Sequence, residues 1–169
     1  MGFELIVVRW VHVLAGIAWI GLLYYFNFVQ GPALAKAKAD GTAAGITTHV
    51  APRALLWFRW AAVVTWVTGA VYLMRAPSLS FVDAFMLNAS ANPQNAVIGM
   101  GAWLGTIMIF NVWVLIWPNQ KKVLGLVKAE DAEKTKAARV AFLASRTNTM
   151  LSIPMVFFMV AGPHLPRLA

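Results

Sequence analysis

Histidines are the residues of this 169-residue chain best suited to metal or redox chemistry, because it contains no cysteine. His12 lies inside the apolar stretch RWVHVLAGIAWIGLLYYFNFVQ (9–30). Gly16 follows four residues later and shares one helix face with it. An imidazole beside a bare backbone patch suits a flat cofactor such as haem b, whose iron takes an axial histidine. The alternative is a neutral histidine that hydrogen-bonds to a neighbouring helix, with Gly16 serving helix packing.

His164 lies just past the last apolar segment, in GPHLP, and helix alternation puts it on the same side as His12. The two histidines together could ligate one haem iron or one metal ion, whereas zinc and copper sites usually take three or four ligands. The alternative for His164 is a solvated terminal residue. Arg9 and Arg59 are the expected partners for haem propionates.

A second group of polar residues lies toward the other side of the predicted membrane segments and could hold an anion or a substrate carboxylate. Its members are His49, Arg59, Arg146 and Asn148. The alternative is that the cations simply anchor the protein to anionic lipid. Arg59 differs from the others because it falls inside an apolar span and needs a partner or a path to the membrane surface.

The composition indicates that water is not the main solvent around this chain. Hydrophobic residues make up 60% of the chain and charged residues 12%, against roughly 25% charged in soluble domains. The lack of cysteine excludes disulfides, iron–sulfur clusters and a c-type haem. The net charge of +8 is concentrated in connections between apolar segments, which is typical of membrane orientation and not of nucleic-acid binding.

Apolar lengths predict an all-α integral membrane four-helix bundle forming one domain over 1–169. A bilayer core of about 30 Å needs about 20 apolar residues in a helix. Gly31-Pro32 and Pro118 are expected to end the first and third helices, and 120–139 is expected to be a helical extension. A short interfacial helix is expected within 81–87. The predicted spans are 5–28, 54–73, 96–117 and 141–162.

The distribution of basic residues predicts the orientation. Two connections should face the cytoplasm, because positive charge stays on that side. The opposite side carries only Arg9, Arg75 and Arg167, so both termini should lie on the outer, periplasmic side of a bacterial inner membrane. The basic residues of the two connections are Lys36, Lys38, Arg53, Lys121, Lys122, Lys128, Lys134, Lys136, Arg139 and Arg146.

Four stretches resemble the membrane domain of PuuD-type bacterial urate oxidases, in the order of that family. They are RWVHVLAGIAWIGLLYYFNF (9–28), WFRWAAVVTWVTG (57–69), NVWVLIWPNQKKV (111–123) and SRTNTMLSIPMVFFMVAGPHLP (145–166). The resemblance implies a longer membrane region followed by a cytochrome c domain, and neither occurs in this sequence. His12, Arg59, Asn148, Pro154 and His164 match the family pattern.

Two departures bear on activity. The resemblance implies an acid where this chain has Ala61, and a histidine where it has Thr147. Acids and histidines are both groups that handle protons in catalysis. Whether the chain is an enzyme is therefore left open by the sequence.

A looser resemblance in the first span reaches HemJ-type and CopD-like membrane proteins, of which the HemJ type resembles small haem-b-binding bundles. The first hypothesis is therefore a haem b redox or electron-transfer subunit that works with a separate cytochrome or other membrane subunits. The alternatives are a cofactor-free structural subunit of a membrane assembly and a urate oxidase-like enzyme. The expected surroundings are a lipid bilayer, with no nucleic acid.

Overall fold

The computed structural model describes residues 2–90 and 92–162, and within them every regular element is helical. Three continuous helical segments are long and apolar enough to cross a membrane. They are Phe3–Ala39, Ile46–Arg75 and Pro93–Val123. A further long helix, α7 (Asp131–Ala161), carries more polar residues, and its membrane crossing stays a prediction.

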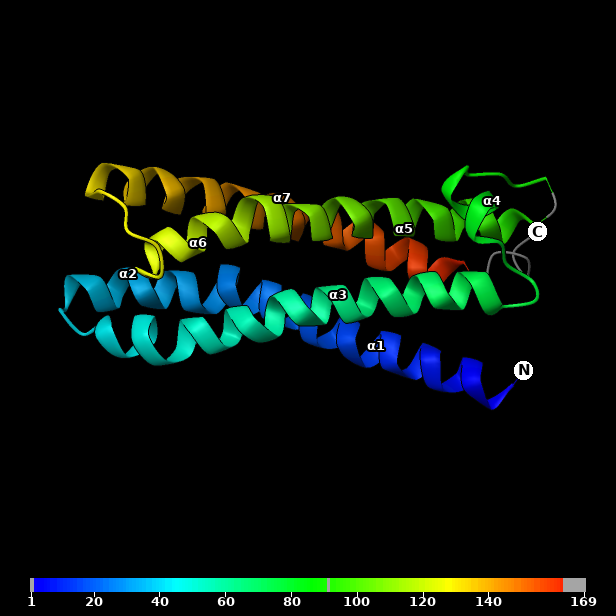
Figure 1. The fold of residues 1–169 in the computed structure, drawn as a ribbon, viewed down its shortest axis with the longest axis horizontal. Coiled ribbons are helices and arrows are strands. Elements are labelled where there is room, and N and C mark those ends of the chain that lie inside the picture. Colours follow the sequence, from blue (N-terminus) through cyan, green and yellow to red (C-terminus); the bar gives the residue numbers. More distant parts are fainter. Residues whose placement is uncertain (1, 91, 163–169) are drawn as a thin grey trace.

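The long helices lie side by side as two antiparallel hairpins (Figure 1). The first pairs α1 (Phe3–Tyr24) with α3 (Ala51–Arg75), and the second pairs α5 (Pro93–Phe110) with α7. The N-terminus and α4 (Phe81–Phe85) lie at one end, which we call the α4 end. The opposite end, which we call the loop end, holds the connection 124–130.

Proline does not end the helices as the sequence suggested. Pro32 and Pro118 were expected to stop two of them, yet each helix continues, through α2 (Gly31–Ala39) and α6 (Trp117–Val123). In both cases a π-helical turn precedes the proline: η1 (Tyr25–Gln30) and η3 (Asn111–Ile116). The residue before each proline donates to a carbonyl five residues back, Gly31 to Phe26 and Trp117 to Val112. The wider turn accommodates the ring that would otherwise collide with the preceding turn.

A third proline repeats this arrangement. Pro52 follows the π-helical turn η2 (Ile46–Val50), where Ala51 donates to the carbonyl of Ile46. Residues 46–53, which precede the expected span 54–73, are therefore already helical. The helices consequently begin earlier or end later than the apolar spans predict.

Glycine ends the helices at the loop end. Gly41 and Gly125 have φ angles of 71° and 73°, which cost glycine little. The residue after each donates to a carbonyl five residues back, Thr42 to Ala37 at 2.8 Å and Leu126 to Lys121 at 2.9 Å. This is the Schellman arrangement. The helical extension expected over 120–139 is therefore interrupted at 124–130.

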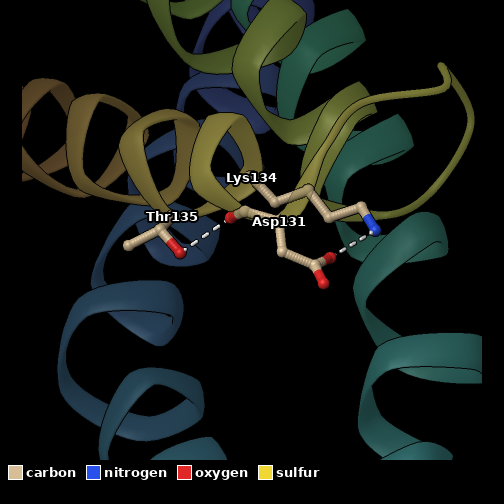
Figure 2. Close-up of polar contacts among 3 residues, drawn as sticks. All are labelled: Asp131, Lys134 and Thr135. Carbon is tan, nitrogen blue, oxygen red and sulfur yellow. Dashed lines mark hydrogen bonds and ion pairs between the residues drawn. The ribbon is translucent and has the colours of Figure 1, made fainter.

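Helix α7 begins with acidic residues, which suit the positive end of the helix dipole. Lys134 Nζ donates to Asp131 Oδ1 at 3.0 Å, and Thr135 Oγ1 donates to the Asp131 carbonyl at 2.9 Å (Figure 2). Glu130 precedes the helix as its N-cap. The helix starts ten residues before the expected position 141.

Helix α4 confirms the short helix expected within 81–87. Ser80 caps it by accepting from the Asp83 N–H at 3.2 Å. It packs on α5 at Gly99, where a Cβ would collide with the Ala84 carbonyl. Trp103 Nε1 also donates to the Phe85 carbonyl at 2.9 Å.

The apolar core joins the two hairpins midway along their length. Its largest completely or almost completely buried side chains come from three helices: Trp19, Leu23, Phe58 and Met108. Many other large apolar side chains are exposed along the outer faces of the helices. Such surfaces suit contact with lipid.

Candidate functional site

His12 lies between α1 and α3 and has a fixed orientation. Its Nδ1 is 2.8 Å from the carbonyl oxygen of Thr65. A carbonyl only accepts, so Nδ1 carries the proton and donates, which leaves Nε2 of the neutral ring with a free electron pair. Within 2–90 and 92–162, no hydrogen-bond partner of Nε2 is found.

Small residues on α3 make room for this ring. A Cβ at Gly69 would lie 2.9 Å from His12 Cε1 and 3.1 Å from Nδ1. The hydroxyl of Thr68 lies 3.5 Å from Nδ1, but it donates to the Val64 carbonyl at 2.6 Å. The imidazole therefore rests directly on the backbone of α3.

Gly16 takes part in the same helix contact. Its Cβ position is 3.8 Å from Thr65 Cγ2, an ordinary packing distance. The small face of α1 is thus covered by α3 next to the histidine. Sequence reasoning missed the α3 residues that contact His12. Their signal in the sequence was the spacing Thr65-x-x-Thr68-Gly69 within an apolar span.

A second polar region lies where α7 meets α1, α5 and η3. Its α7 residues repeat with helical spacing, so they share one face: Ser145, Asn148, Thr149 and Ser152. Asn148 is completely buried; it accepts from Asn111 Nδ2 at 2.8 Å and donates to the Met108 carbonyl at 2.9 Å.

Two further hydrogen bonds reach this polar face, one from Tyr24 at the end of α1 and one from Asn27 in η1. Asn27 donates to Ser145 Oγ at 2.8 Å. Ser152 Oγ donates to the Thr149 carbonyl at 2.7 Å, so the Tyr24 hydroxyl is the donor in the 3.0 Å contact with Ser152. These bonds connect the hairpins, because polar side chains in apolar surroundings seek partners.

The four residues expected to form an anion site are not joined to one another. Asn148 is occupied as described above, and His49 is exposed in η2. Arg146 is exposed over the ring of Phe142, at 5.3 Å, and Arg59 stacks on Trp117, at 3.8 Å. Within the described ranges, no hydrogen bond or ion pair links any two of the four.

The two remaining residues expected at the site are Arg9 and His164. Arg9 is exposed, one helical turn before His12, and lines a shallow open hollow with Ile6, Trp10 and Val13. His164 lies outside the described residues. Among the residues that the structure describes, no group of three or more potential metal ligands occurs.

The two positions that depart from the resemblance differ in burial. Ala61 lies in the core at 8% exposure, and Thr147 is exposed next to the buried Asn148. Neither side chain can accept or release a proton at neutral pH.

The fold and its apolar lengths define an all-helical protein with at least three helices suited to crossing a membrane. Residues 1–80 and 76–168 match the model of the family described as urate oxidase N-terminal. The chain belongs to this family, which confirms the resemblance to the PuuD-type membrane domain. No curated protein and no solved structure is significantly similar to the chain.

Proposed function

We propose that the chain is a membrane-embedded subunit that binds haem b through His12 Nε2 and exchanges electrons with a separate cytochrome or oxidoreductase. The observation that carries this is the Nδ1 hydrogen bond to the Thr65 carbonyl, 2.8 Å long. Histidines that ligate metals commonly donate their second ring nitrogen to a carbonyl, which fixes the tautomer and orients the ring. His12 therefore fits the part of an axial ligand.

Bound haem would supply one-electron chemistry that the side chains themselves lack. In this proposal Thr65 and Gly69 hold the imidazole, and Arg9, one turn away, pairs with a propionate. Arg59 is not assigned to the haem, because it stacks on Trp117. His164 stays a proposed second ligand. The four-span topology and the placement in a bacterial inner membrane are also parts of this proposal.

A cofactor-free structural subunit is the second candidate, and one observation favours it specifically. Gly16, expected to offer a flat surface to a cofactor, faces Thr65 instead. The contacts around His12 would then serve only to pack α1 on α3. Purification in mild detergent should in that case yield partner subunits and no chromophore.

Urate oxidation by this chain ranks below both, although its family is named for that activity. Ala61 and Thr147 provide no proton-handling group at the two expected positions. Assays of urate loss with an added cytochrome c acceptor test this role directly.

The His12→Ala variant distinguishes the first two candidates. If haem is bound at His12, this substitution removes most of the b-type absorbance, whereas His49→Ala, in an exposed residue of the same type, retains it. Circular dichroism checks that both variants are folded. Full haem content in His12→Ala would refute the ligand assignment.

A further inference from the structure

Arg59 is held in place but leaves its hydrogen-bond donors unused. Its Cζ lies 3.8 Å from the centroid of the Trp117 ring, so α3 and α6 are joined by a cation–π contact. Within 2–90 and 92–162, no carboxylate lies within 4.0 Å of the guanidinium, and none of its N–H groups finds a hydrogen-bond acceptor. A guanidinium has five such donors in a fixed plane, matched to phosphate or carboxylate.

A second cation shares the same indole. Lys121 Nζ lies 5.9 Å from the centroid of the Trp117 ring. Its neighbour Lys122 pairs with Glu133 of α7 at 3.9 Å, whereas no ion pair of Lys121 occurs within 2–90 and 92–162. The Trp117 ring therefore carries two positive groups without a paired carboxylate, which favours an anion.

The surroundings identify what kind of anion fits. Trp60 is 52% exposed and packs edge-on against Trp113, with 5.6 Å between ring centroids, and Trp57 is 69% exposed. Exposed indoles of this kind gather where a membrane meets water. A phosphate that carries acyl chains uses both the cations and the exposed rings, whereas a free phosphate ion uses only the cations.

Helix length places these residues at the correct depth. An apolar core spanned by about 20 residues, counted along α3 from Arg75, ends near residue 55. The same count from Ala96 through α5 and η3 ends near Trp117, the first residue of α6. Trp117 and Lys121 therefore lie at the headgroup level of the loop end. Arg59 lies about four residues, or ~6 Å, deeper along α3, and its side chain reaches toward that level where it stacks on Trp117.

We propose that Arg59, Lys121 and Trp117 form a binding site for the phosphate group of an anionic phospholipid, with Trp57 and Trp60 against its acyl chains. The site is independent of His12. Arg59 precedes Thr65 by six residues, which is about 9 Å along the helix.

Brominated lipids, which quench tryptophan fluorescence on contact, test this proposal with the full chain. The protein is reconstituted in phosphatidylcholine vesicles with increasing fractions of brominated phosphatidylglycerol or, in parallel, brominated phosphatidylcholine. We expect the anionic lipid to quench at a lower mole fraction. Arg59→Gln and Lys121→Gln should each raise its half-quenching fraction about fivefold.

Matched controls separate this site from general surface charge. Arg53→Gln removes an exposed charge from the same helix, and Lys128→Gln removes one from the nearby loop; both should behave as wild type. Equal effects of Arg59→Gln and Arg53→Gln would overturn the proposal. So would equal quenching by the two brominated lipids.

Excess inorganic phosphate in the same vesicles distinguishes the two sources of phosphate. Retained preference for phosphatidylglycerol supports a lipid site, and complete loss of the preference would assign the site to a free anion instead. If Arg59→Gln does not fold, Lys121→Gln decides the outcome, because that side chain is only partly buried on α6.

Discussion

Within residues 2–90 and 92–162, His12 is positioned by the backbone of α3 and not by another titratable side chain. The Thr65 carbonyl and the glycine at position 69 both act on the ring, one by hydrogen bonding and one by leaving space. Residue type and spacing were enough to select His12 and Gly16 from the sequence. The contact with a neighbouring helix was one of the two alternatives considered for His12 and Gly16. Residue type and spacing did not identify that helix as α3, because helix partners are set by packing between segments distant in the chain.

The space at Gly69 gives a direct test of this packing. In Gly69→Ala the added methyl would lie 2.9 Å from His12 Cε1, so the ring or the helix must move, and we expect a loss of about 1–3 kcal/mol in stability. Thermal unfolding in detergent measures it. Gly21→Ala is the control, because its Cβ meets nothing within 4 Å. Equal melting of the two variants would show that His12 does not pack tightly on α3.

At the scale of elements, the sequence predicted the helices well and their ends poorly. Pro32 and Pro118 were interpreted as stops, because the usual rule considers the α-helical turn alone. The π-helical turns η1 and η3 remove the expected clash of the proline ring with the preceding turn. No simple residue pattern predicts such turns. Gly41 and Gly125, in contrast, mark real helix ends because their positive φ suits glycine.

The docking of α4 depends on one residue of α5. In Gly99→Ala the methyl would collide with the Ala84 carbonyl, which is backbone and cannot move aside cheaply. We expect α4 to detach locally, so that amides of residues 81–87 exchange hydrogen faster. Gly105→Ala, on the same helix, meets nothing within 4 Å and should leave exchange unchanged. Unaltered protection in Gly99→Ala would contradict the packing of α4 on α5.

For the whole molecule, composition and apolar length predicted an all-helical protein with membrane-length segments, as found. Composition and apolar length did not predict which helices pair. They also did not predict the polar face of α7, because buried side chains such as Asn148 lower the apolar character of that helix. A helix whose polar residues bond to other helices therefore has a low hydropathy, whatever its position.

Orientation is testable because the chain has no cysteine of its own. Single cysteines at Ser78, near the α4 end, and at Lys128, in the loop-end connection, can be labelled with a membrane-impermeant thiol reagent. Since positive charge favours the cytoplasmic side, Ser78→Cys should react in intact spheroplasts and Lys128→Cys only after lysis. The reverse pattern would invert the proposed topology.

The central claim, haem b at His12, is tested most directly by a reduced-minus-oxidised visible spectrum of the purified protein, with haem extraction to identify the type. A b-type spectrum with about one haem per chain is the expected result. A flat spectrum from folded protein that was purified with haem supplied would contradict the claim. It would leave His12 as a residue that packs α1 on α3.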